Sequence, residues 1–201
     1  MRITPTLFKG ITLLTIIVAI WGCASTQGPA ATEQKPEPAA SATVHSVQQA
    51  KPLDARFSDI LVNDIKATDV IKTDYPAALS DLESSLIAHL RSKKAYARVV
   101  HNPGAAPAQS ALLVNLTITD MRIPSAGARF WGGPLAGSSY MNIDLELVDA
   151  ASGESLRKET ISSTNSAMAA SWNFGASDRS LPSDMGVIIG EYIYTVAPAE
   201  K

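Results

Sequence analysis

The sequence predicts an α+β domain with a single antiparallel or mixed sheet of about four to five strands and two amphipathic helices on one side. Residues 111–123 and 140–150 alternate apolar and polar side chains, which is the period of a strand with one covered face. Residues 75–94 and 182–196 carry apolar side chains at steps of three and four, which is the period of a helix that packs one stripe against a core. Hydrophobic residues make up 46% of the 201 residues, enough for the core of one domain.

The segment 54–201 is expected to hold this domain, and it opens with a strand, a helix and a strand. Residues 58–66 predict a strand with a short buried middle, and residues 96–101 predict a second strand. Between them lies the helix 75–94, for which Asp74 is a suitable N-cap because its carboxylate can accept the free amide hydrogens of the first turn. The stripe of this helix that faces the core comprises Leu79, Leu82, Leu86 and Leu90.

A long hairpin follows, and its second arm is expected over 154–164. Asp144 and Glu146 point outward from the first arm, so that they can oppose Arg157 or Lys158, depending on the register. The final helix begins near Pro182, with Ser180 or Ser183 as the cap. The inward side chains of the two long alternating strands are Leu112, Val114, Leu116, Ile118, Met141, Ile143, Leu145 and Leu147.

The first 23 residues have the order of a secretion signal. A basic start with Arg2 and Lys9 is followed by an apolar run over 10–21. As a helix this run spans about 18 Å, which is well short of the ~30 Å hydrocarbon core of a bilayer. The length therefore predicts a cleaved signal peptide and not a permanent membrane helix. The run ends in Ile20-Trp21-Gly22-Cys23, which holds the single cysteine of the chain.

This ending resembles the lipobox of bacterial lipoproteins, in which an aliphatic residue, a variable residue and a small residue precede the modified cysteine. The resemblance implies cleavage before Cys23, a diacylglyceryl group on its thiol and a further acyl chain, such as palmitate, on the new amino terminus. More than one acyl chain is what stable anchoring requires. Ala24 stands where aspartate would favour retention in the inner membrane, so the resemblance implies lipid anchoring at the outer membrane. The periplasmic face is the expected one, although the sequence alone leaves the face open.

Residues 24–53 are expected to be a disordered tether between the anchor and the domain. They are rich in Ala, Pro, Ser, Thr and Gln and show no apolar periodicity, so they cannot offset the entropy lost on ordering. A flexible coil of this length spans roughly 30 Å. The tether can lift a domain off the bilayer surface.

The order of these parts, together with the turn Val148-Asp149-Ala150-Ala151-Ser152-Gly153-Glu154 in a long hairpin, resembles a family of small envelope lipoproteins. That family is called domain of unknown function 4410, and the resemblance covers about 54–196. More distantly the chain is similar to the curli-secretion lipoprotein and to the amino-terminal domain of the Tol translocation protein. The resemblance implies an α/β fold and binding or assembly work in the envelope, and it brings no catalytic residues.

The connection 124–139 between the two long strands carries Arg129, Phe130 and Trp131 beside glycines. The slightly favoured interpretation is that both aromatic side chains fold back over the edge of the sheet as part of the core. The alternative is a loop that contacts a partner or a membrane, because Trp, Phe and Arg are enriched where interfaces bury anchors. Trp172, just before the last helix, is a further candidate of the same kind, and for it the core interpretation is favoured more clearly.

No constellation of residues predicts catalysis, a metal or a cofactor. His45, His89 and His101 have no metal-ligand spacing, and there is no second cysteine. The Gly-x-Ser-x-Gly turn of many hydrolases is missing, as is the lysine of a phosphate-binding loop. The net charge of −2 and the lack of a basic face argue against nucleic acid as a partner.

The expected function is therefore that of a lipid-anchored cell-envelope protein, held at the membrane by its anchor, whose non-catalytic domain binds an envelope protein or supports assembly. The first alternative is a pore or secretion-complex subunit of the curli-secretion type. Outward Asp144 and Glu146 speak against it, because strands that face lipid would carry apolar residues there. The second alternative is an envelope hydrolase. The sequence leaves the partner and the oligomeric state open.

Overall fold

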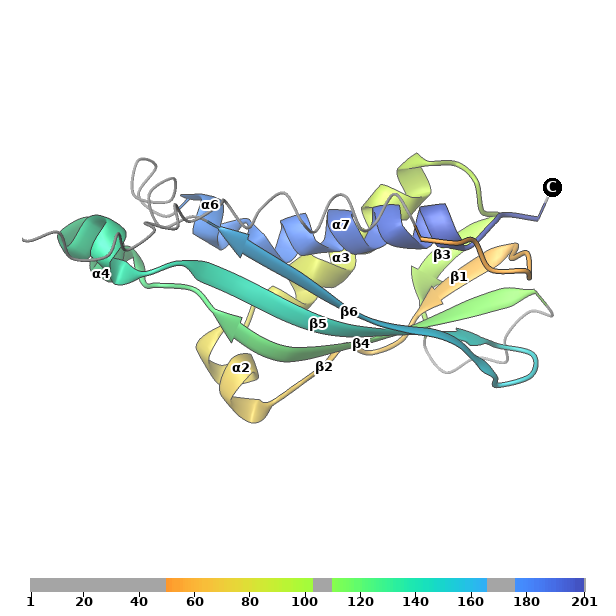
Figure 1. The fold of residues 1–201 in the computed structure, drawn as a ribbon, viewed down its shortest axis with the longest axis horizontal. Helices are drawn as coiled ribbons and strands as arrows, with labels where there is room; N and C mark the ends of the chain where they lie inside the picture. The colour runs from red at the N-terminus through yellow and green to blue at the C-terminus, as the bar shows by residue number, and fades with distance from the viewer. Residues whose placement is uncertain (1–49, 103–109, 166–175, 201) are drawn as a thin grey trace, which may run out of the picture. The chain divides into compact units, whose positions relative to one another are not determined.

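A computed structural model describes residues 50–102, 110–165 and 176–200, which belong to one compact unit of the chain (Figure 1). The predicted signal peptide, Cys23, the tether up to residue 49 and Trp172 lie outside the described residues. Among the described helices, none combines the length and the apolar character needed to cross a membrane.

The described strands form one mixed, six-stranded sheet in the order β3-β1-β4-β5-β6, and the short β2 pairs with β4. The strand β1 (Asp59–Val62) is parallel to β3 (Arg98–His101) and to β4 (Ala111–Arg122). The long hairpin of β5 (Ser139–Asp149) and β6 (Ser155–Asn165) continues the sheet with antiparallel pairing, and β2 (Lys66–Ala67) runs parallel to β4. The predicted single sheet, antiparallel or mixed, is thereby confirmed, and its pairing is mixed.

Two long helices, α3 (Ala78–Ser92) and α7 (Leu181–Val196), cover the same face of this sheet (Figure 1). The predicted stripe of α3 is confirmed, since Leu82, Leu86 and Leu90 are fully buried and Leu79 packs against the core as a partly buried side chain. The inward residues that alternation predicts in β4 and β5 are buried as well. The opposite face of the hairpin carries polar side chains, including the predicted pair of Glu146 with Lys158, whose charged atoms are 3.1 Å apart.

The predicted helix 75–94 begins later than expected, because an additional short helix, α2 (Asp69–Asp74), precedes it. Thr68 caps α2, and its hydroxyl accepts a hydrogen bond from the amide of Ile71. Asp74 therefore ends one helix and does not cap the next, for which Ala77 occupies the N-cap position without a side-chain hydrogen bond. A six-residue helix is too short to leave a clear apolar period in the sequence.

The ordered domain also begins earlier than the predicted boundary at Asp54. The amide of Leu53 donates to the carbonyl of Val196 at the end of α7, over 2.7 Å, and Ala50 and Leu53 pack against the core. Phe57 then pairs with Ala199 in an isolated parallel bridge. Residues 50–53 thus belong to the domain, because Leu53 has its backbone partner at the end of α7 and Ala50 and Leu53 pack against the core.

Candidate interaction surface

The connection between β4 and β5 forms a small projecting unit, the α4–η1 tip, which consists of the helix α4 (Ala126–Gly132) and the 3-10 helix η1 (Gly133–Ala136). Ser125 caps α4 by accepting the amide hydrogen of Ala128, with 3.1 Å between nitrogen and oxygen. Figure 1 shows α4 beyond the end of the sheet, at the opposite end from β1 and β3. The tip is therefore a structured extension of the domain.

Three large apolar side chains of the tip are exposed. Phe130 is 63% exposed, Trp131 is 87% exposed and Leu135 is 94% exposed. The rings of Phe130 and Trp131 meet edge to face with their centroids 5.1 Å apart. The interpretation that both aromatic side chains fold over the sheet edge as core is therefore wrong. Leu135 joins them, although no pattern in the sequence distinguishes it.

Arg129 faces the opposite way, into the protein, and this corrects its assignment to the contact surface. Its side chain is fully buried and forms two hydrogen bonds with the carboxylate of Asp178 on the short helix α6 (Ala176–Arg179), at 2.6 Å and 3.2 Å. The hydroxyl of Ser139 donates to the same carboxylate over 2.6 Å. One guanidinium nitrogen, Nη1 of Arg129, is buried without a hydrogen-bond partner in the described part of the chain. This buried cluster fastens the tip to α6 and to β5.

A second brace comes from the end of β4. The guanidinium of Arg122 donates to the carbonyl oxygen of Ala136 over 3.0 Å, beyond which the chain turns at Gly137. Gly137 has a φ of +86°, and a Cβ atom there would lie 2.7 Å from the guanidinium of Arg122. The backbone conformation therefore favours glycine at this position, and a larger residue would also have to displace the end of the Arg122 side chain.

An apolar hollow of about 290 Å³ lies at the same end of the domain and is called here the Tyr75 hollow. The hydroxyl of Tyr75 accepts a hydrogen bond from the amide of Ile123, two residues before the cap of α4. Arg179, next to the Asp178 that holds the tip, also contributes to the hollow. Its lining residues are Tyr75, Pro76, Ala77, Ala78, Asp81, Met121, Ile123, Arg179 and Pro182.

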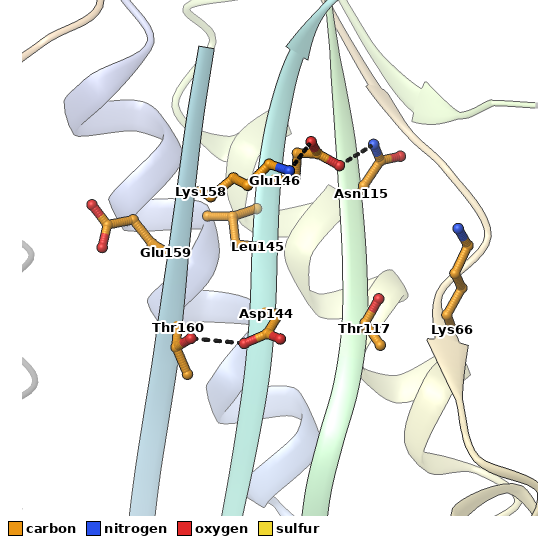
Figure 2. Close-up of a pocket in the computed structure, with 9 residues that line it drawn as sticks. All are labelled: Lys66, Asn115, Thr117, Asp144, Leu145, Glu146, Lys158, Glu159 and Thr160. Carbon is orange, nitrogen blue, oxygen red and sulfur yellow. Dashed lines mark hydrogen bonds and ion pairs between the residues drawn. The ribbon is translucent and has the colours of Figure 1, made fainter. Parts of the chain in front are cut away.

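The open face of the sheet carries a shallow polar groove of about 460 Å³ across β4, β5 and β6, which Figure 2 shows. In this groove the carboxylate of Glu146 accepts hydrogen bonds from Ser155, Lys158 and Asn115. The hydrogen bond from Ser155 and then that from Lys158 lower the pKa of Glu146 from its usual value. Asp144 accepts a hydrogen bond from Thr160 over 2.7 Å. Glu146 is thus an ionised group that already has partners, and it does not resemble a general acid poised near neutral pH.

The histidines of the described residues are held by carboxylates. His89 lies 2.9 Å from Glu191, and His101 lies 2.8 Å from Glu83 and 3.4 Å from Asp64. In the described ranges, no group of three or more His, Cys, Asp or Glu side chains is arranged to hold a metal ion. Of the predicted site residues, Arg129, Phe130 and Trp131 lie together in the tip. Arg129 is buried, whereas Phe130 and Trp131 are exposed.

Comparison with known proteins gives one match by family. The model of the family described as domain of unknown function (DUF4410) matches residues 30–171. No curated protein sequence matches the chain significantly.

Several solved structures are similar to the chain. They include the PelC dodecamer from Paraburkholderia phytofirmans, with 17% identity over 71% of this chain and 93% of that chain and a TM-score of 0.47. A DUF330 protein from Xanthomonas campestris is 10% identical over 72% of this chain and 89% of its own, with a TM-score of 0.46. A lipoprotein from Neisseria meningitidis is 14% identical over 54% of this chain and 83% of its own, with a TM-score of 0.35.

Proposed function

The chain belongs to the DUF4410 family, and we propose that it is a lipid-anchored protein of the bacterial cell envelope whose domain binds another protein without catalysing a reaction. The single observation that carries the binding role is the α4–η1 tip, which exposes Phe130, Trp131 and Leu135 while a buried ion pair fixes its backbone.

Exposure of these three side chains is costly unless a partner covers them. Burying a side chain of this size stabilises a protein or a complex by roughly 1.5–3 kcal/mol. Most of this stabilisation is missing while the three side chains of the tip are exposed to water. A cluster of exposed apolar groups on a monomer marks an interaction site more often than a chance arrangement. Aromatic side chains are also the ones that dominate the energy of protein interfaces.

The tip is also held in one conformation before it meets a partner. Arg129 and Asp178 form a buried ion pair at its base, and Arg122 donates hydrogen bonds to the carbonyl oxygens of Ala136 and Ser138. A surface that is ordered in advance loses less conformational entropy on binding. Without catalysis to perform, a domain of this kind acts through where it is held and what it contacts.

Lipid anchoring at Cys23 would hold the domain at the membrane surface. Only 26 residues separate Cys23 from Ala50, so the domain would stay near the membrane surface. Confinement to this layer raises the effective concentration of the domain for partners in the same layer. Ala24 after the modified cysteine supports sorting to the outer membrane.

The anchor is tested by replacing Cys23 with serine. We expect the Cys23→Ser protein to move from the membrane fraction to the aqueous fraction, because the hydrophobic leader is too short to remain as a span. Fractionation of cells with immunodetection measures this change. Ala24→Asp serves as the matched control, because it keeps the acyl chains and should remain in the membrane fraction, but in the inner membrane. A Cys23→Ser protein that fractionates like the parent contradicts the anchor.

The binding role is tested by placing a photoreactive amino acid at Trp131 in living cells. We expect irradiation to join this position to a defined envelope protein, detected by mass spectrometry after purification in denaturant. The matched control is Val70 on α2, which is also exposed and apolar, at 68%, but lies outside the tip. Equal capture at both positions, or none at Trp131, would speak against a docking role for the tip.

A further inference from the structure

The α4–η1 tip and the Tyr75 hollow have opposite shapes and the same apolar character. We propose that two copies of this chain pair through this end of the domain, with the tip of each copy seated in the Tyr75 hollow of the other. The proposal rests on the proposed function, since it names the protein that the tip binds.

The hollow matches the tip in chemistry. Its walls are mainly apolar, and the tip brings no exposed charge into it, because Arg129 is the only charged residue between Arg122 and Tyr140 and it is buried. The tip itself therefore carries no charge that would have to be desolvated, and the charged side chains at the hollow are Asp81 and Arg179. The volume of about 290 Å³ suits one large aromatic side chain.

Trp131 carries one N–H group that needs an acceptor when the ring is buried. The hollow offers such an acceptor in the carboxylate of Asp81, which makes no side-chain hydrogen bond or ion pair within the described residues. The hollow thus provides apolar walls for the indole ring and an oxygen for its nitrogen. This combination favours Trp131 over Phe130 or Leu135 as the side chain that enters deepest.

The placement of the two features predicts a closed pair. Ile123 lines the hollow and Ser125 caps the tip helix, while Arg179 lines the hollow and Asp178 holds the tip. Tip and hollow therefore lie close together on each copy. When a two-fold axis brings one tip to the hollow of a second copy, it brings the other tip to the first hollow as well, so both apolar surfaces are covered.

The area available is sufficient for a weak pair. An aromatic side chain buries about 150–250 Å² when it is fully covered, so the exposed parts of the tip provide roughly 300–500 Å² per copy. Two tips and the two hollows that receive them stay below the ~1,200–2,000 Å² of stable specific interfaces, in the size range of weak, transient contacts. Such a pair would dissociate readily in free solution and would be favoured where anchoring concentrates the chains.

The test uses the full-length, acylated chain in its own membrane. Cells produce two versions with different affinity tags, and only one version carries a photoreactive amino acid at Trp131. We expect irradiation to join the two tagged versions, with the attachment sites in 75–78 or 121–123 of the second version. Ala77→Glu in the second version should lower this yield at least tenfold, because it places a larger side chain and a second carboxylate, beside Asp81, in the hollow. Glutamate is favourable near a helix N-terminus, so α3 should tolerate the change.

The matched control is Ser84→Glu, which adds the same charge to an exposed position of α3 outside the hollow and should leave the yield unchanged. Capture of a different protein with no joined copies would overturn the pairing while supporting the proposed function. Joined copies whose attachment sites lie elsewhere, or whose yield Ala77→Glu does not lower, would overturn the pairing too. Capture of lipid alone, or of nothing, would overturn both.

Discussion

Replacing Asp178 with alanine is expected to lower the free energy of unfolding by about 3–5 kcal/mol, which is the cost of leaving a buried charge without its partner. The guanidinium of Arg129 would remain fully buried and lose both of its hydrogen bonds to Asp178. The guanidinium already lacks one hydrogen bond, because its Nη1 atom has no partner among the described residues. The hydroxyl of Ser139 would lose its acceptor as well.

Unfolding in denaturant measures the loss, and limited proteolysis within 126–136 shows whether the tip detaches first. Asp184→Ala is the matched control. It removes an exposed aspartate from α7 whose side chain accepts one hydrogen bond, from Ser180, and should cost less than about 1 kcal/mol. The double substitution of Arg129 by methionine and Asp178 by leucine should restore much of the stability, because it removes both charges. If Asp178→Ala costs no more than Asp184→Ala, the ion pair does not hold the tip.

The hairpin shows what could be predicted from the sequence. Apolar side chains recur at every second position from Leu112 to Ile118 and from Met141 to Leu147, and a period of two leaves only the choice of the covered face. The turn that joins the two arms of the hairpin could be predicted from the sequence as well. Asp149 accepts hydrogen bonds from the amide of Ala151 and the hydroxyl of Ser152, and Gly153 adopts a φ of +73°. Local chemistry determines both features.

The position of β1 could not be predicted in the same way. All four of its residues are buried, so no alternation reveals a face, and both of its neighbours are strands parallel to it. Parallel pairing depends on the crossover through α2 and α3, which the tertiary structure determines. The alternation in the hairpin therefore predicted a sheet with one open face, but not the parallel half of that sheet.

From the sequence, the interaction surface could be predicted only as the segment 124–139, and not as a set of exposed side chains. Phe130 and Trp131 beside glycines are compatible with a core position or with an exposed one, because apolar character alone does not decide between them. The deciding contact joins Arg129 to Asp178, which are 49 positions apart. No local pattern connects them, and Asp178 stands out neither by spacing nor by its neighbours in the sequence.

The second large effect is expected at the contact between the two long helices, where Gly186 of α7 lies against the backbone of α3. A Cβ atom at this position would lie 2.6 Å from the carbonyl oxygen of Leu82 and 2.8 Å from the amide nitrogen of Leu86. Backbone atoms inside a helix cannot move aside independently, so the whole helix would have to shift. Gly186→Ala is therefore expected to lower the free energy of unfolding by about 1–3 kcal/mol.

Gly190→Ala, one turn further along α7, is the matched comparison. At both positions alanine has a helix propensity about 1 kcal/mol more favourable than that of glycine. A Cβ atom at Gly190 would lie 2.8 Å from Cδ2 of the His89 ring, which can rotate away, and 3.3 Å from the Cβ atom of His89, which needs only a small shift. The rotation would break its 2.9 Å contact with Glu191, whose carboxylate would keep Lys93 at 2.6 Å. Gly190→Ala should therefore cost less than Gly186→Ala in denaturant unfolding, and the reverse order would contradict this account of the helix contact. Because Asp178 lies just before α7, a shift of this helix in the Gly186→Ala protein should also loosen the tip and increase its proteolysis.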